Sequence, residues 1–343
     1  MRGAIVGCGF FAQNHLNSWR DMRADGVEMV AVCDLDAAKA KAAADTFGIP
    51  RVYTNPNELM AAETLDFIDI VTRMETHKDL VLESIRRGVR TIVQKPFAPD
   101  WAGCLVLYRA AKAAGVPLAV HENFRYQKPM LAVREVIDSG VIGPLSWGRV
   151  TLRTGYDLYK TQPYFHNETR FILLDCGVHV LDLARYFLGE VAHLACETQR
   201  RNPKNIGEDT ATMMLRHTSG AVSVVEVTYE ARQIPDPFPQ TLVTIEGERG
   251  SIKLHEDFRL VVTADGKMSE RHVGSPLLAW TAEPWHILQE SVLATQRAII
   301  GAWKAGREPD TSAEDNLKTY ALAEAAYASA ETRRAVKPEA ASA

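Results

Sequence analysis

Residues 4–12 read AIVGCGFFA, an apolar run followed by a glycine-rich turn, and this stretch decides the fold. Its last six residues fit the pattern G-x-G-x-x-G/A. In that pattern the first glycine permits a tight turn, the second lets the backbone approach a pyrophosphate, and the small last residue lets a helix pack on the strand. Free N–H groups at the helix N-terminus would attract the phosphates. The sequence therefore predicts a strand, a helix and, between them, a phosphate-binding turn built from Gly7, Gly9, Phe10, Phe11 and Ala12.

Strand and helix patterns alternate through the first third of the chain. Helical patterns separate apolar strands that are predicted at 4–6, 27–33, 67–71, 91–93 and 118–120. Such alternation favours a doubly wound parallel sheet with right-handed crossovers. We predict an α/β Rossmann domain over residues 1–123.

An acidic residue, Asp34, ends the second predicted strand, 22 residues after Ala12. A carboxylate there can accept hydrogen bonds from both ribose hydroxyls of a dinucleotide and would repel a 2′-phosphate. This favours NAD over NADP. The structural alternative is that Asp34 caps the next helix, although Asp36 is better placed for that.

The pattern changes after about residue 145. Several strands follow one another without helices between them, at 191–200, 210–216, 221–229, 241–246, 251–254 and 259–263. Helices are expected at 171–188, 283–303 and 313–334. This predicts a second domain over 124–343, of the α+β class, with a large, mostly antiparallel, open-faced sheet.

Thirteen of the 18 residues at 171–188 are apolar, which predicts a helix buried on nearly all sides. Asp175, His179 and Asp182 lie at i, i+4 and i+7 and are expected to share one face. Buried polar side chains need partners or a cavity. An internally satisfied Asp–His pair is one explanation, and a catalytic site is the other. Lys95 follows the fourth strand, at the edge of a parallel sheet where ligands bind. The alternative, which is the commoner one for a Lys-Pro pair, is a surface lysine before a turn proline.

Three segments together resemble the Gfo/Idh/MocA family of oxidoreductases: the glycine turn, Gln94-Lys95-Pro96 and Asp175-Cys176-Gly177-Val178-His179. The resemblance covers nearly the whole chain. It implies NAD-dependent oxidation of a sugar or polyol hydroxyl, with hydride passing to the nicotinamide. Gln94 departs from the family pattern, which usually has Glu there, and this puts cofactor positioning and lysine basicity in doubt.

The resemblance also implies residue roles. Lys95, Asp175 and His179 are expected to be catalytic, and either Lys95 or His179 takes the proton. A lysine can do so near neutral pH only if burial or a nearby cation lowers its pKa. Asp175 would bind a neighbouring substrate hydroxyl and hold His179 in position. Further cofactor contacts are expected from Thr72, His77, Gln94, Lys95 and Asn123, and substrate contacts from Lys95, Arg125, Arg153, Tyr156, Asp175, His179, Trp285 and His286.

Some of these residues have structural alternatives. His77 fits the start of a helix equally well, Arg125 fits a surface ion pair, and Trp285 fits a buried core. The proline-rich run 235–239 predicts a stiff loop, at an interface or at the rim of a pocket. No spacing of residues suggests a bound metal.

Composition limits the classes of function. The 343 residues carry a formal net charge of −4, which argues against a nucleic-acid binder that relies on broad positive charge. No apolar run is long enough to span a bilayer, no secretory signal pattern is visible, and the five cysteines form no CxxC pair. We expect buried thiols in a cytoplasmic protein, which forms a homodimer or homotetramer through the open sheet.

Functional alternatives are an inositol or aldose dehydrogenase, an NAD-recycling glycosidase or oxidoisomerase, and a non-catalytic NAD sensor.

Overall fold

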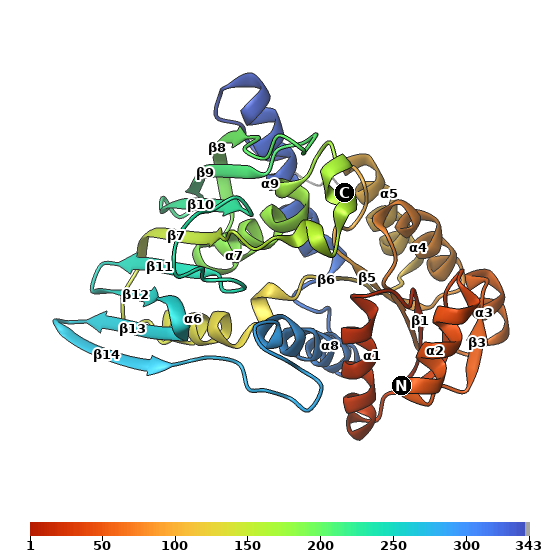
Figure 1. The fold of residues 1–343 in the computed structure, drawn as a ribbon. Coiled ribbons are helices and arrows are strands. Elements are labelled where there is room, and N and C mark those ends of the chain that lie inside the picture. The colour runs from red at the N-terminus through yellow and green to blue at the C-terminus, as the bar shows by residue number, and fades with distance from the viewer. Residues whose placement is uncertain (340–343) are drawn as a thin grey trace. The chain divides into compact units, whose positions relative to one another are not determined.

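The computed structural model describes residues 1–339, and the chain divides into two compact units (Figure 1). Of the described residues, the first unit contains Met1–Asn123 and Ser291–Leu317, and the second contains Phe124–Glu290 and residues 318–339. Two contacts show how the later segment joins the first unit. Asn123 Nδ2 donates to Ser291 Oγ at 2.7 Å, and Arg297 pairs with Asp25 at 3.0 Å.

The first unit holds a six-stranded, all-parallel sheet with the strand order β3-β2-β1-β4-β5-β6. This confirms the predicted Rossmann fold. Its strands are β1 (Arg2–Val6), β2 (Glu28–Cys33), β3 (Arg51–Tyr53), β4 (Phe67–Ile70), β5 (Arg90–Gln94) and β6 (Leu118–His121). Its helices between the strands are α1 (Ala12–Asp21), α2 (Ala37–Phe47), α3 (Pro56–Ala62), α4 (His77–Arg86) and α5 (Trp101–Ala114).

Local sequence signals set the ends of these helices. The Asp36 carboxylate accepts hydrogen bonds from the N–H groups of Ala38 and Lys39, at 2.9 and 3.3 Å, and so caps α2. Gly48 ends the same helix with φ of 63°, a left-handed conformation that glycine adopts without a steric penalty. Thus Asp36 caps the helix, and Asp34 is left for another role.

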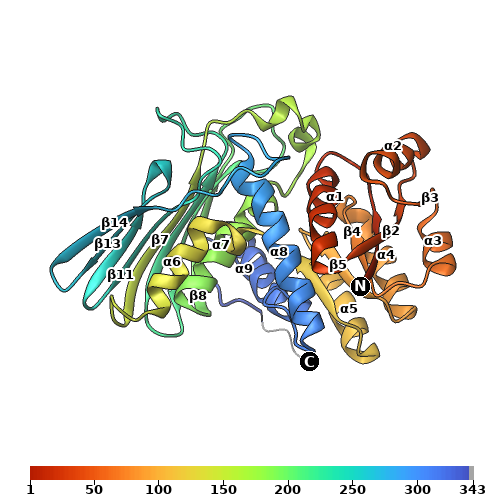
Figure 2. The same ribbon diagram turned by 90° about the horizontal axis from the view of Figure 1, so that it is seen from below.

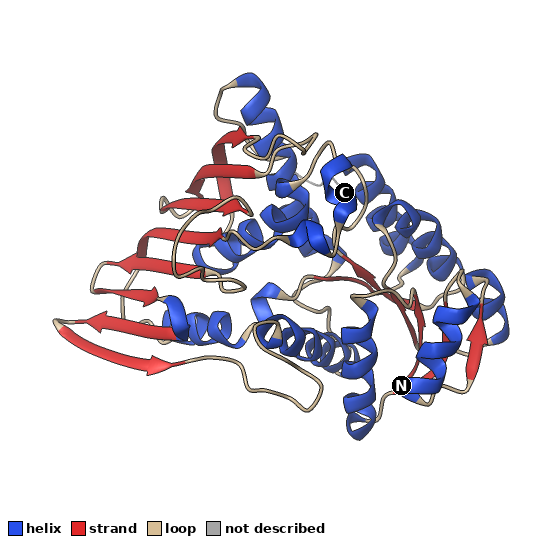
Figure 3. Cartoon of the chain, in the orientation of Figure 1, coloured by secondary structure: helices blue, strands red, loops and turns tan. Residues whose placement is uncertain are grey.

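The second unit is built on an eight-stranded sheet with the order β14-β13-β12-β11-β7-β10-β9-β8, red in Figure 3. Only β7 and β10 pair in parallel, so the predicted mostly antiparallel sheet is confirmed. Its strands are β7 (Leu145–Arg153), β8 (Val191–Gln199), β9 (Thr210–His217), β10 (Val222–Thr228), β11 (Leu242–Gly247), β12 (Gly250–Leu254), β13 (Arg259–Ala264) and β14 (Lys267–His272). Its helical elements include η3 (Phe124–Tyr126), α6 (Lys128–Asp138), η6 (Leu173–Gly177) and α7 (Val178–Leu188), while α8 (His286–Lys304) and α9 (Ala313–Thr332) each have residues in both units.

Helices α6 and α7 and the second-unit part of α9 lie on one face of this sheet (Figure 2). The other face is open, and the alternation along β9 shows it. Met213 and Leu215 are buried under the helices, whereas Thr212, Met214 and Arg216 are exposed. The predicted open-faced sheet is therefore present.

The helix expected at 171–188 differs from the prediction at its N-terminal end. Residues Leu173–Gly177 form a π-helical turn, and α7 begins only at Val178. A π-helical turn is wider than an α-helical one. The i, i+4 spacing that placed Asp175 on the face of His179 therefore does not apply to Asp175, whereas His179 and Asp182 keep their α-helical relation.

Within residues 1–339 no helix has both the length and the apolar character needed to cross a membrane.

Candidate active site

The glycine turn between β1 and α1 has the geometry of a phosphate cradle. Gly7 has φ of 99°, and a Cβ there would lie 2.3 Å from the carbonyl oxygen of Val71, so only glycine fits. A Cβ on Gly9 would meet no atom within 4 Å, which leaves open space where a ligand can approach the backbone. Phe10 is 73% exposed, and Ala12 is buried at the start of α1. The surroundings of Gly7, Gly9 and Ala12 are therefore compatible with their predicted roles: a tight turn, backbone access for a pyrophosphate, and close packing of the helix.

Asp34 holds this turn to the end of β2. Its Oδ2 accepts a hydrogen bond from the Cys8 N–H at 2.8 Å, and its Oδ1 accepts one from the Asp36 N–H at 2.9 Å. The carboxylate remains partly exposed. It is therefore fixed by the main chain beside the cradle, in the place where an acidic residue would meet a ribose.

His77 connects the loops that follow β4 and β5. Its Nδ1 lies 3.1 Å from the Pro96 carbonyl oxygen and 3.3 Å from that of Phe97, and its Nε2 lies 3.2 Å from that of Thr72. The imidazole is fully buried, and this burial lowers the pKa of His77. If His77 contributes to cofactor binding, it therefore does so by holding these two loops in place. One of the loops carries Lys95.

Gln94 and Lys95 lie at the end of β5. The side-chain carbonyl of Gln94 accepts a hydrogen bond from the Lys95 N–H at 2.8 Å. A neutral amide thus supplies the acceptor that a carboxylate would supply in the family pattern. Lys95 is partly buried and precedes Pro96 through a cis peptide bond. Asn123 is buried and uses its amide within the first unit, in the hydrogen bond to Ser291.

In the second unit, His179 on α7 is buried and stacks on Phe124. The ring centroids are 3.8 Å apart, and the planes differ by 2°. The next residue, Arg125, binds the Asp182 carboxylate with both Nε and Nη2, at 2.5 and 2.7 Å. These contacts fix the orientation of the His179 ring by tying η3 to α7. Sequence reasoning missed Phe124, because nothing in the sequence shows which residue will pack on His179.

Asp182 is the centre of a buried ionic network. The Thr319 hydroxyl donates to it at 2.7 Å, and Arg185 Nη1 lies 3.8 Å away. The side chains of Arg125 and Asp182 are 8% and 2% exposed. The alternative of an ion pair for Arg125 thus describes its geometry, although the pair is buried rather than on the surface. A direct substrate contact by Arg125 remains a prediction.

Asp175 contacts Tyr229, which follows β10. The Tyr229 hydroxyl lies 3.5 Å from Asp175 Oδ2 and 2.8 Å from Cys176 Sγ. Burial, together with the neighbouring Cys176 and Asp175, raises the pKa of Tyr229, so the phenol stays protonated and can donate to the carboxylate. Sequence reasoning missed this residue. Its place as the last residue of the strand predicted over 221–229 was the one available signal.

The remaining predicted substrate residues lie in the second unit. Arg153 ends β7, and Tyr156 follows it in the next loop. The rings of Tyr156 and Trp285 are perpendicular, with centroids 5.4 Å apart, and both are partly exposed, so Trp285 is not a core residue. His286 is buried, and its Nδ1 has no hydrogen-bond partner among the described residues. A buried imidazole nitrogen of this kind suits a ligand hydroxyl.

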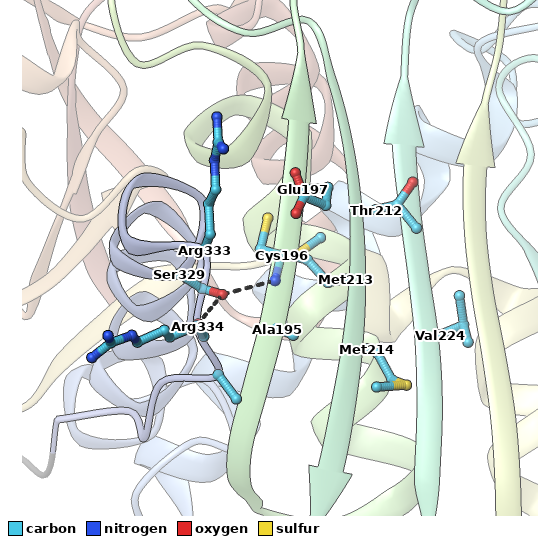
Figure 4. A pocket seen from close by; sticks show the side chains of 11 residues that line it. Ala195, Cys196, Glu197, Thr212, Met213, Met214, Val224, Ser329, Arg333 and Arg334 are labelled. Atoms are coloured by element: carbon cyan, nitrogen blue, oxygen red, sulfur yellow. Dashed lines mark hydrogen bonds between the residues drawn. The ribbon is translucent and has the colours of Figure 1, made fainter.

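A cavity of about 350 Å³ lies elsewhere in the second unit, at the edge strand β8 (Figure 4). Ser329 on α9 donates to the Arg334 carbonyl and accepts from the Cys196 N–H beside it. Arg333 and Arg334, which also line the cavity, follow α9 and are labelled beside Ser329 in Figure 4. None of the predicted site residues lines it, so we place it outside the candidate active site.

Across residues 1–339 no cluster of three or more His, Cys, Asp or Glu side chains is arranged to hold a metal.

The parallel sheet with its glycine cradle, followed by a unit with an open-faced sheet, defines a dinucleotide-dependent oxidoreductase of two units. Residues 1–122 match the model of the oxidoreductase family with an NAD-binding Rossmann fold, GFO_IDH_MocA. Residues 130–253 match the GFO/IDH/MocA C-terminal domain. The chain therefore belongs to the Gfo/Idh/MocA family of NAD-binding oxidoreductases, as its motifs predict.

Three similar proteins cover almost the whole chain. A D-apiose dehydrogenase from Paraburkholderia graminis is 45% identical over 98% of this chain and 89% of its own length. A D-apiose dehydrogenase from Rhizobium rhizogenes is 44% identical over 98% of this chain and 97% of its own length. The crystal structure of an oxidoreductase from Agrobacterium radiobacter, in complex with NAD⁺, L-tartaric acid and magnesium, has a TM-score of 0.96 and 44% identity over 98% of both chains.

Proposed function

We propose that this protein is an NAD-dependent sugar dehydrogenase that oxidises D-apiose at the anomeric carbon to D-apionolactone. The observation that carries the proposal is the identity of 44–45% to two D-apiose dehydrogenases over 98% of this chain, together with the presence of Lys95, Asp175 and His179. Alternative activities within the family include inositol and aldose oxidation.

The first unit supplies the cofactor residues. Bound NAD provides the hydride acceptor of the reaction. The open space at Gly9 leaves the backbone N–H groups of the turn accessible to a pyrophosphate. Asp34, fixed by Cys8 and Asp36, presents a carboxylate suited to ribose hydroxyls and unfavourable to a 2′-phosphate, so NAD is the preferred cofactor.

The chemistry requires two groups to leave the anomeric centre. The C1–H bond breaks as its electron pair departs with the hydrogen as hydride, and the O1 proton passes to a base of the protein. The C1–O1 bond thereby becomes the carbonyl of a lactone. Lys95 or His179 accepts the proton, and Asp175 binds a neighbouring hydroxyl. Two contacts support these roles because they hold the two candidate bases in place. The Gln94 side chain accepts a hydrogen bond from the Lys95 N–H, and the Phe124 ring stacks on His179.

The second unit supplies further contacts to the sugar. The Nδ1 of buried His286 has no hydrogen-bond partner within residues 1–339 and suits a substrate hydroxyl, and Arg153 carries its charge at the end of β7. Tyr156 and Trp285 add aromatic surface that can cover C–H bonds of the sugar.

The proposal is tested by following NADH formation with D-apiose and a panel of aldoses, polyols and inositols. We expect one NADH per D-apiose oxidised, a lactone product, and activity reduced at least about a hundredfold in Lys95→Ala, since a positioned base contributes this much. An enzyme that recycles its cofactor would convert substrate without net NADH. A wild-type protein that reduces no NAD with any member of the panel would contradict the proposal.

We also propose a homodimer or homotetramer that packs through the open sheet face. That face of the sheet carries no helices, and β9 presents Thr212, Met214 and Arg216 on it, which gives a second copy of the chain a sheet surface to pack against. Light scattering at micromolar concentration should give twice or four times the monomer mass of 38.0 kDa. A single monomer peak would contradict this proposal. All five cysteines are buried and none of them forms a disulfide, which supports a cytoplasmic location.

A further inference from the structure

The loop between β10 and β11 returns closely over the end of β7. Strands β7 and β10 run in parallel, so Arg153 and Thr228 end them side by side. The Thr154 N–H donates to the Thr228 carbonyl at 3.0 Å, and the Ala231 N–H donates to the Thr154 carbonyl at 3.0 Å. The two chains therefore stay in contact beyond the sheet.

Asp236 fixes the tip of this loop. Its Oδ1 accepts hydrogen bonds from the Thr154 hydroxyl at 2.7 Å and from the Phe238 N–H at 2.9 Å. Its Oδ2 accepts one from the Gly155 N–H at 2.6 Å. A Cβ on Gly155 would lie 2.6 Å from the Ala231 carbonyl oxygen, so the close approach requires glycine. One carboxylate thus binds both sides of the loop junction.

Phe238, held by Asp236, belongs to an aromatic group with Tyr156 and Trp285. Phe238 stacks on Tyr156 with centroids 4.0 Å apart and planes differing by 7°. Trp285 stands at 81° to Phe238, with centroids 4.9 Å apart. All three rings remain partly exposed, whereas rings that serve only a core are normally buried. The group therefore presents an apolar surface rather than filling an interior.

A continuous set of contacts connects this surface to Asp175. Tyr156 packs against the buried cluster of Leu158, Phe165 and Phe171, and Tyr229 packs against the same cluster. Tyr229 in turn contacts Asp175. The aromatic group and the expected catalytic carboxylate are thus connected through one packed cluster of the second unit.

We propose that Phe238 is a specificity-determining residue of the sugar site. Held by Asp236, its ring forms with Trp285 an apolar wall that packs against C–H bonds of the sugar. A sugar that directs a hydroxyl at this wall loses that group's hydrogen bonds to water and gains none, so it binds less well. This inference rests on the proposed sugar dehydrogenase function, and it assigns a role to the proline-rich loop.

The test compares four variants with the wild type: Phe238→Ala, Phe238→Leu, Phe238→Tyr and Asp236→Asn. For the sugar that the wild type oxidises best, Phe238→Ala should raise KM about tenfold, in line with the loss of an aromatic contact. The ratio of kcat/KM for that sugar to kcat/KM for epimeric aldopentoses should also be smaller in Phe238→Ala than in the wild type. Phe238→Tyr keeps the flat ring that packs against the C–H bonds of the sugar and should stay near wild type. Phe238→Leu is apolar but lacks this flat face and its stacking on Tyr156, so it should resemble Phe238→Ala. Asp236→Asn should raise KM in the same direction.

Controls separate the wall from general damage to the fold. NADH binding, measured by fluorescence, and the thermal unfolding temperature should stay close to wild type in Phe238→Leu and Phe238→Tyr. Equal KM values and equal sugar preference in these two variants would overturn the proposal, even if Phe238→Ala failed to fold. A wild type that oxidises no sugar would overturn the proposed function and this inference with it. An active wild type with an unchanged Phe238→Leu would overturn only this inference.

Discussion

Substitution of Asp182 by asparagine should strongly destabilise the second unit, because Asp182 is the buried anion between two arginines. Arg125 donates to it through Nε and Nη2, and the Thr319 hydroxyl donates as well. Arg185 lies within 3.8 Å of the same carboxylate. An amide would keep acceptor capacity on one oxygen but lose the negative charge that Arg125 contacts, whereas Arg185 would keep its ion pair with Glu190 at 2.9 Å.

The expected magnitude follows from this geometry. Removing one partner of a buried ion pair costs about 3–5 kcal/mol, since the remaining charge stays buried without its counterion. The asparagine retains part of the hydrogen bonding, so we expect the lower end, about 3 kcal/mol. For a folding unit of this size, that loss corresponds to a decrease in Tm of about 6–12 °C.

Urea and thermal unfolding of Asp182→Asn measure this loss, and Asp45→Asn is the matched control. Asp45 pairs with Lys41 at 2.8 Å on the exposed surface of α2. Exposed pairs contribute no more than about 1 kcal/mol. If the two aspartate variants lost equal stability, our account of the buried network would be wrong.

The same pair should also affect catalysis, because it fixes η3 to α7 beside the Phe124–His179 stack. Arg125→Met combined with Asp182→Leu replaces both charges by apolar side chains and should be more stable than either single variant. If Arg125 acts only as a support, this double variant should retain substrate affinity and lose mainly kcat. A large rise in KM would instead identify Arg125 as a substrate contact.

Three further predictions concern individual positions. Tyr229→Phe removes the hydroxyl that lies beside Asp175 and should lower kcat by up to about tenfold without changing NADH binding, which steady-state kinetics and fluorescence titration would show. Gly7→Ala places a Cβ 2.3 Å from a main-chain oxygen at positive φ, so calorimetric titration should show NAD binding weakened more than tenfold, about 1.4 kcal/mol or more; unchanged affinity would refute the cradle geometry. Burial lowers the pKa values of His217 and His77. The unfolded chain then binds more protons as pH falls below about 6.5, so stability should decrease from pH 7.5 to pH 5. The decrease in Tm should be smaller in His217→Gln, and an identical decrease would contradict the stated direction.

The sequence was sufficient for the parallel sheet because its signals are local. The glycine turn at 7–12 specifies its own backbone, Asp36 caps the helix that follows it, and Gly48 and Gly115 end helices in the left-handed conformation. Each signal depends on residues within a few positions of one another. Such signals survive in any tertiary context, and the structure confirms the five predicted strands of the first unit. Edge strand β3 and helix α3 were not predicted.

The elements that were missed lack a local signal. Strand β14 consists of exposed residues only, so it shows no alternation of apolar and polar side chains. Central strand β7 carries polar residues on its open face and was not identified. Helix α6 was likewise not predicted. The π-helical turn at Leu173–Gly177 depends on how the chain enters α7, which a periodicity argument cannot detect.

The candidate catalytic residues were identified by motif, but the residues that hold them were not. Phe124 is 55 positions from His179, and Tyr229 is 54 positions from Asp175. These partners meet only because separate elements pack together. Positioning residues therefore have to be read from the structure, even where the catalytic residues can be read from the sequence.

Each unit holds a candidate catalytic side chain by fixing the residue beside it. In the first unit, the Gln94 amide holds the main chain of Lys95, and buried His77 binds the loop just beyond it. In the second, the ion pair of Arg125 holds the segment whose Phe124 stacks on His179. Fixing the backbone beside a catalytic group limits its displacement while leaving its polar atoms to the substrate, which is what a proton acceptor requires. Substitutions at these neighbours should consequently change turnover more than they change the affinity for NAD.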